Sequence, residues 1–139
     1  MKSENTVNDE FFDCAGNKRV FRLATAATPG FFEGVELRRG EPVGLRFLLP
    51  IESGKAPPWG EMREKIRKRL SSRDLVRDED GELHNLNNII RAQIHDRTGD
   101  GMPTLVIDDE EIDWDELGAI IKIHSGWGLR IEICNIGDE

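Results

Sequence analysis

The chain contains no tyrosine and only two cysteines, and its 139 residues include no long hydrophobic run. A membrane-spanning helix needs roughly 18–20 consecutive apolar residues, so we expect no membrane contact. Cys14 and Cys134 lie far apart without a Cys-x-x-Cys spacing, which favours reduced thiols over a disulfide framework. The first ten residues lack the apolar centre of a signal peptide. These absences predict a cytoplasmic protein.

Motifs for catalysis and cofactor binding are also missing. The chain has no Gly-x-Gly-x-x-Gly or Walker sequence and no recognisable serine or cysteine nucleophile motif. The three histidines, His84, His95 and His124, are scattered and lack the spacing of metal ligands. The sequence therefore predicts no cofactor and no metal, and it favours a non-catalytic protein over an enzyme.

Positive charge is outnumbered by negative charge, with 19 Lys/Arg against 27 Asp/Glu, and it is unevenly distributed. The net charge of −8 disfavours general attraction to nucleic acid or anionic membranes. Residues 61–73 nevertheless hold six Lys/Arg against two Glu. No lysine or arginine lies between Arg97 and Lys122, and seven carboxylates crowd positions 108–116. These two segments of opposite charge are candidates for binding a partner or for pairing with each other.

The N-terminal part of the chain predicts a loose segment and then a hairpin. Residues 1–18 are polar apart from Phe11 and Phe12, so we expect a flexible lead-in. We expect residues 19–139 to form a single α+β domain. Its first part, residues 19–40, predicts a β-hairpin, because two strand-like segments flank a Thr-Pro-Gly turn at 28–30.

Residues 43–134 predict alternating strands and helices. Apolar and polar residues alternate at 43–49, 90–95, 104–107 and 129–133, which is typical of half-buried strands. One helix begins at Pro57 and Pro58 and has the apolar stripe Trp59, Met62, Ile66 and Leu70. A second helix begins at Asp113, where Glu116 completes a capping box, and ends before Gly126.

This order of elements is the ferredoxin-like βαββαβ pattern. Its antiparallel sheet carries both helices on one face, which explains strands with a single apolar side. The hairpin at 19–40 would extend an edge of the sheet or cover its open face. A four-stranded α+β sandwich of another topology is the main alternative.

The C-terminal part carries a recognisable pattern. Thr-Leu-Val-Ile-Asp-x-x-x-Ile at 104–112 precedes Trp-x-Glu-Leu-Gly at 114–118, Gly-Trp at 126–127 and Leu-x-Ile-x-Ile at 129–133. The pattern resembles a bacterial family known only as a domain of unknown function, over roughly residues 32–134. Some relatives carry an added N-terminal zinc-ribbon-like segment, which the lone Cys14 does not support here. The resemblance implies a fold and no activity.

The basic segment 61–73 is the first candidate binding site. Its cations could hold phosphates by charge. In a ferredoxin-like sandwich, however, the two helices run antiparallel, so residues 67–73 would face Asp113, Asp115 and Glu116. We favour this structural explanation. The candidate residues are Arg63, Lys65, Arg67, Lys68, Arg69 and Arg73.

The open face of the predicted sheet is the second candidate site. Arg46, Arg91, His95 and Arg130 would project there, beside Gln93, Glu132 and Cys134. Such a face could bind an anion, an RNA strand or an acidic peptide, although it offers no Phe or Tyr for base stacking. We favour burial of this face with salt bridges.

Two acidic loops resemble calcium sites only superficially. In the loop that starts at Asp96, position twelve needs a bidentate Glu but is Ile107. Residues 78–81 fail as well, because the first position of that loop falls on Val76. We expect both loops to be turns, and we expect the carboxylates at 108–116 to be solvated or to cap a helix.

Three classes of function stay open. The first is a non-catalytic binding or regulatory module that acts through a protein partner or as a homo-oligomer. The second is a nucleic-acid-binding protein that uses residues 61–73. The third is a small metal-dependent hydrolase built on Asp96, Asp100, Asp108 and His95. The absence of catalytic motifs and the segregated charge favour the first class.

Overall fold

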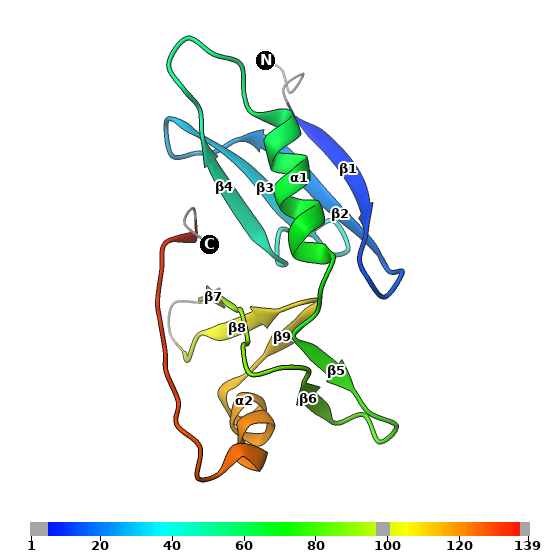
Figure 1. Cartoon of the computed structure of the whole chain (residues 1–139). Coiled ribbons are helices and arrows are strands. Elements are labelled where there is room, and N and C mark those ends of the chain that lie inside the picture. Colours follow the sequence, from blue (N-terminus) through cyan, green and yellow to red (C-terminus); the bar gives the residue numbers. More distant parts are fainter. Residues whose placement is uncertain (1–5, 97–100, 137–139) are drawn as a thin grey trace. The chain divides into compact units, whose positions relative to one another are not determined.

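The structure is a computed structural model that describes residues 6–96 and 101–136. It is a mixed α+β protein in which the strands form three antiparallel sheets. The chain divides into two compact units, shown in Figure 1. The first unit comprises Met1–Ser72 and Asn135–Glu139, and the second unit comprises Arg73–Cys134. In the ranges described, no helix combines the length and apolar character that crossing a membrane requires.

A four-stranded antiparallel sheet forms the body of the first unit. Its strands are β1 (Val7–Phe12), β2 (Lys18–Thr25), β3 (Phe31–Leu37) and β4 (Arg46–Pro50), and each pairs with the next along the chain. Helix α1 (Trp59–Leu70) lies along one face of this sheet (Figure 1). Strands β2 and β3 confirm the predicted hairpin, in whose turn Gly30 has a φ of +86°.

The core of the first unit lies between α1 and the sheet. The predicted apolar stripe of the helix is confirmed, since Met62, Ile66 and Leu70 are buried. The helix approaches β3 closely at Gly34, where an added Cβ would lie 3.1–3.2 Å from side-chain atoms of Leu23, Met62 and Ile66. A Cβ at position 34 would therefore require these side chains to shift by a few tenths of an ångström.

The second unit is built from shorter elements. Strands β5 (Leu75–Arg77) and β6 (Leu83–Asn85) form a hairpin, and β7 (Gln93–His95), β8 (Thr104–Ile107) and β9 (Glu110–Ile112) form a three-stranded sheet. Helix α2 (Trp114–Ile121) and the 3₁₀-helix η2 (Lys122–His124) follow. The predicted capping box is present, because Asp113 and Glu116 each accept a hydrogen bond from the other's backbone N–H. The buried core consists of Leu75, Leu105, Ile107, Ile112 and Ile120.

The mixed α+β class with antiparallel sheets is confirmed, whereas the ferredoxin-like topology expected from the sequence is not. The four predicted core strands do not share a sheet: β4 pairs with β3 in the first unit, whereas β7 and β8 pair in the second. Residues 129–133 belong to no strand of the described structure. Pairing of sequence neighbours explains the difference, because closing a short loop costs less conformational entropy than closing a long one.

The N-terminal lead-in is also more ordered than predicted. Residues 7–12 form β1, which pairs with β2 in the register Phe11↔Arg19. Phe11 is buried and packs edge-on against Phe21, with ring centroids 5.6 Å apart. Side chains alternate between the two faces of β1, and the buried Phe11 therefore anchors a segment that is otherwise mainly polar. Residues 1–5 lie outside the described residues.

Two predicted turns have different outcomes. Residues 78–81 connect β5 to β6, and Gly81 has a φ of +83°, which confirms a turn at that position. The predicted hairpin turn at 98–101 connects two strands that do pair, β7 and β8. Residues 97–100 of that turn lie outside the described residues, so its geometry stays a prediction.

Candidate functional site

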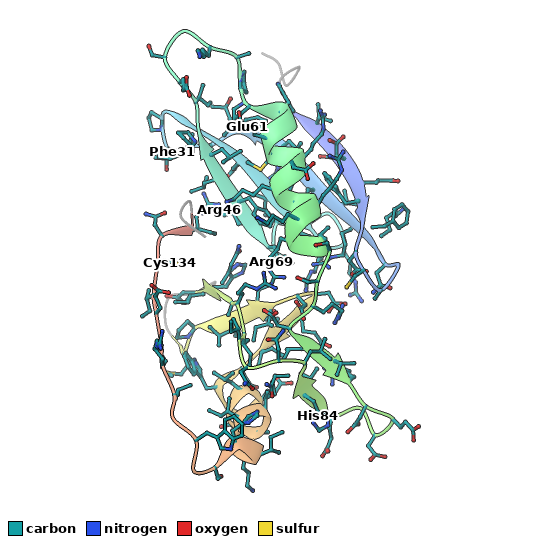
Figure 2. All side chains as sticks on the ribbon, viewed as in Figure 1. Phe31, Arg46, Glu61, Arg69, His84 and Cys134 are labelled. Carbon is teal, nitrogen blue, oxygen red and sulfur yellow. The ribbon has the colours of Figure 1, made fainter. Side chains whose placement is uncertain are left out.

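Two basic residues of α1 contact carboxylates and aromatic rings of the first unit. Arg63 donates a hydrogen bond to Asp9 with an N–O distance of 2.6 Å, and its guanidinium lies over the ring of Trp59. Arg67 lies 3.5 Å from Glu64 and over the ring of Phe11. Lys65 and Arg69 are half-buried, whereas Lys68 is exposed (Figure 2). The positive charges of Arg63 and Arg67 are therefore engaged in contacts within the first unit.

One residue of the basic segment 61–73 pairs with the acidic run 108–116 within the second unit. Arg73 follows α1 rather than belonging to it, and its guanidinium donates to Asp109 at 2.9 Å. Asp113 and Glu116 instead cap α2 through each other.

The arginines predicted to share one open sheet face belong to different elements of the chain. Arg46, in β4, donates to Glu33 at 3.1 Å, whereas Arg91 precedes β7 in the second unit. Arg130 is exposed and belongs to no strand of the described ranges. His95 lies in β7, but the predicted alternation is inverted there, since Gln93 is buried and Ile94 is 59% exposed. A period of two residues has two possible phases, and the sequence does not choose between them.

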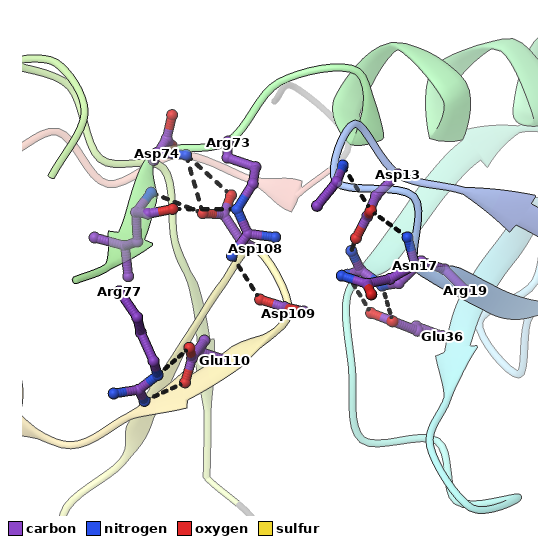
Figure 3. A network of polar contacts seen from close by, with 12 residues as sticks. Asp13, Asn17, Arg19, Glu36, Arg73, Asp74, Arg77, Asp108, Asp109 and Glu110 are labelled. Carbon is purple, nitrogen blue, oxygen red and sulfur yellow. Dashed lines mark hydrogen bonds and ion pairs between the residues drawn. The ribbon is translucent and has the colours of Figure 1, made fainter. Parts of the chain in front are cut away.

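Two carboxylates form a buried polar centre in the second unit (Figure 3). Asp108 lies in the β8–β9 turn with a φ of +55°, and its oxygens accept hydrogen bonds from the backbone N–H groups of Asp74 and Leu75 at 2.9 and 2.8 Å. Asp74 in turn accepts hydrogen bonds from the backbone N–H, Nε and Nη2 of Arg91 at 2.7–3.1 Å. This network joins three segments of the unit, and no sequence motif indicated it.

An arginine joins two buried carboxylates in the first unit (Figure 3). Arg19 donates to Asp13 and to Glu36, each at 3.0 Å, and all three side chains are buried. Burial opposes ionisation of Asp13, but hydrogen bonds from the N–H of Asn17, from Arg19 and from the N–H of Ala15 outweigh it and hold the pKa of Asp13 below its ordinary value. The partners therefore compensate the cost of burying charge.

One small cluster has the ligand types of a metal site. Oxygen or nitrogen atoms of Asp78, Glu82 and His84 all lie within 4.8 Å of one another. The His84 ring nitrogen lies 2.7 Å from Asp78 Oδ2, and this hydrogen bond is the main cause that lowers the pKa of Asp78. The other oxygen of Asp78 already accepts from the N–H groups of Asp80 and Glu82. We interpret the cluster as the closing contact of the β5–β6 hairpin.

The residues of the hydrolase hypothesis do not gather in one described cavity. His95 and Asp96 line a shallow depression of about 380 Å³ together with Glu111. Asp108 instead faces the backbone N–H groups of β5. Asp100 lies outside the described residues. The described residues of this set are therefore divided between the depression and the buried polar centre.

Among the described residues, large apolar side chains exposed to solvent are concentrated in the second unit. Among the described residues, Phe12 is the one such side chain in the first unit, with 68% of its surface exposed. All the others belong to the second unit: Val76, Leu86, Ile89, Ile94, Met102, Trp114, Ile123, Trp127, Leu129, Ile131 and Ile133. Exposed apolar surface on this scale marks interaction sites in soluble proteins.

Residues 127–133 hold the most exposed part of this surface. Trp127, Leu129, Ile131 and Ile133 are 67%, 70%, 75% and 80% exposed. Figure 1 shows the segment as a long stretch of coil after η2. The sequence predicted a strand at 129–133, because apolar and polar residue types alternate there as they do in a strand with one buried face. In the described structure, no strand pairs with these residues. We call residues 127–133 the apolar segment and take it as the candidate site.

The second unit also contains the part of the chain that is shared with other proteins. Residues 74–138 match a family model described as Domain of unknown function (DUF7713). The DUF7713 match begins at the buried Asp74 and includes the apolar segment. It confirms the resemblance to a domain of unknown function for these residues, whereas residues 32–73 lie outside the matched range. No curated protein and no solved structure matches the chain.

Proposed function

We propose that this chain is a non-catalytic protein-binding module and that its second unit carries the binding surface. The observation that carries the proposal is the apolar segment, whose four large side chains are 67–80% exposed. Burying a Leu or Ile side chain contributes about 1.5–3 kcal/mol, so a partner that covers this segment gains substantial binding free energy.

The buried charges of the second unit support a structural rather than a catalytic role. Asp74 is occupied by Arg91, and Asp108 is occupied by two backbone N–H groups. Arg77 donates two hydrogen bonds to Glu110 at 2.8 and 2.6 Å. These contacts hold short strands together, which gives the exposed surface a defined support.

Nucleic-acid binding through residues 61–73 is the alternative. Arg63, Arg67 and Arg73 each pair with a carboxylate, which reduces the charge available for phosphates. The net charge of −8 also repels a polyanion over the molecule as a whole. Both observations favour the protein-binding function.

The proposed function is tested by affinity capture with the full chain. We expect immobilised wild type to retain a protein, either another polypeptide or a second copy, from an extract of cells that express the chain. Ile131→Asp places a carboxylate in the middle of the apolar segment and should abolish retention. Phe12→Asp is the matched control, because Phe12 is exposed to a similar extent in the first unit. Equal retention by wild type and Ile131→Asp would contradict the proposal.

A further inference from the structure

The sequence Leu-Arg-Ile-Glu-Ile at 129–133 is complementary to itself in the antiparallel direction. When Ile131 lies opposite Ile131 of a second copy, Leu129 lies opposite Ile133 of that copy, and Arg130 lies opposite Glu132. Opposite residues of antiparallel strands point to the same face. The apolar residues of both copies therefore share one face, and two Arg–Glu pairs share the other.

We propose that two copies of this chain associate through residues 129–133, which form an antiparallel two-stranded ribbon about a twofold axis at Ile131. This inference rests on the proposed function, because it names the partner that covers the apolar segment. A twofold contact uses the same patch on both copies, so a self-complementary segment is what it requires.

The structure leaves the segment available for such pairing. Residues 129–133 lie in no strand of the described ranges, so their backbone groups are not used in a sheet there. Unpaired N–H and C=O groups of an extended chain are a template for a further strand. Arg130 and Glu132 are exposed, and neither forms an ion pair with another described residue.

Charge complementarity favours a second copy over the other available strands. A parallel pairing in register would place Arg130 against Arg130 and Glu132 against Glu132, and like charges directly opposite are destabilising. In the three-stranded sheet of the second unit, the edge strands β7 and β9 have three residues each and no lysine or arginine to face Glu132. In the two-stranded sheet, Arg77 of β5 already pairs with Glu110. In the antiparallel pairing with a second copy, each of the five residues 129–133 lies opposite an apolar residue or a residue of opposite charge, as its own character requires.

The first test measures the mass of the full chain by light scattering over roughly 1–100 µM, the range in which a short ribbon with one apolar face should associate. We expect wild type to reach twice the chain mass of 15.8 kDa. Ile131→Asp should stay monomeric, because two carboxylates would meet at the axis. The matched control Phe12→Asp should still dimerise. These positions are exposed, and circular dichroism checks that each variant keeps its fold.

Charge reversal tests the register. Arg130→Glu puts a carboxylate opposite Glu132 twice in the dimer, so dissociation should become easier by about tenfold or more. Glu132→Arg should have the same effect. The double variant Arg130→Glu/Glu132→Arg reverses both pairs and should restore wild-type dimerisation. Restoration is expected for this antiparallel register and not for binding to β7 or β9.

Cross-linking tests the position of the axis. In a Cys14→Ser/Cys134→Ser background, Ile131→Cys places two thiols opposite each other at a Cα separation of about 4.5–5.5 Å, within reach of a disulfide. Diamide should oxidise the two thiols to one disulfide between the copies and is itself reduced to the hydrazine. Leu129→Cys should not cross-link, because the two 129 positions lie about 13 Å apart along the ribbon.

The outcomes separate this inference from the proposed function. A monomeric wild type at about 100 µM, or a dimer that Ile131→Asp leaves intact, overturns the second copy as the partner. A double charge variant as weak as the single variants, or efficient cross-linking through position 129, overturns the register. If purified wild type is monomeric while capture from the extract still depends on Ile131, the proposed function stands with a different partner.

Discussion

The two units bury apolar side chains to very different extents. In the first unit, a four-stranded sheet and the 12-residue α1 enclose large side chains that are almost completely buried, among them Phe21, Phe32, Met62 and Ile66. In the second unit, three-stranded and two-stranded sheets and the 8-residue α2 enclose a smaller core. Short elements cover little surface, so this unit leaves most of the chain's large exposed apolar residues in solvent.

The difference shows how each unit is held together. The first unit relies on the contact of one helix with one sheet, drawn close at Gly34. In the second unit, a smaller core is accompanied by polar contacts in which Asp74 and Asp108 connect segments that are far apart in the sequence. Under the proposed function, a partner covers part of the apolar surface of this unit.

The largest expected effect comes from removing one core side chain in each unit. Ile66 and Ile112 are both completely buried, so Ile66→Ala and Ile112→Ala should each cost about 2–5 kcal/mol. We expect each substitution to destabilise its own unit. Hydrogen exchange in increasing denaturant, followed by mass spectrometry, resolves the two units. An equal loss of protection in both units from either substitution would show that they unfold as one.

A smaller effect should follow from changing the polar centre of the second unit. Asp108→Ala removes the acceptor for two backbone N–H groups and should cost about 2–3 kcal/mol. Asp108→Asn keeps one acceptor oxygen and tolerates the positive φ of this position, so it should cost less. Chemical denaturation of the second unit measures both changes.

The backbone conformation at position 108 needs its own control. Asp108→Gly relieves any strain that alanine would suffer at a φ of +55°, but it also lacks the acceptor. We expect the glycine variant to remain less stable than the asparagine variant. Equal stability of these two would assign the role of Asp108 to backbone conformation rather than to hydrogen bonding.

The smallest expected effect is a pH dependence in the first unit. The pKa of Asp13 is lower in the folded state than its ordinary value of 3.8. Its ionised form therefore contributes stability that is complete above the unfolded-state pKa and is lost as the pH falls through the folded-state pKa. Urea unfolding from about pH 6 to about pH 2.5 should show this loss. Asp13→Asn should flatten that part of the profile, and an unchanged slope would contradict the assignment.

Local features could be predicted from the sequence because a few neighbouring residues determine them. The apolar stripe of α1 repeats every three or four residues and identified Met62, Ile66 and Leu70 as buried. The capping box needs only Asp113 and Glu116, three positions apart. The hairpin of β2 and β3 needs a turn with Gly30 between two strand-like segments.

The candidate site could be predicted only in part. Alternation identified 129–133 as a strand-like segment, but the expected buried neighbours are absent in the described structure. The networks around Glu36 and Asp108 were missed, since their partners lie 17 and 33–34 positions away. No short-range pattern links such positions. Within the open-face set, Arg46 and Arg91 belong to different units.

The sequence by itself determined where α1 begins, how α2 is capped, and which residues alternate along the strands, because these depend on contacts within a turn or a pleat. Only the tertiary structure decided which strands share a sheet, which phase of β7 faces inward and which carboxylates are buried. Those outcomes depend on competition among distant segments for the same partners. The apolar segment shows the division clearly: its alternation is local, whereas its exposure depends on what the rest of the fold leaves uncovered.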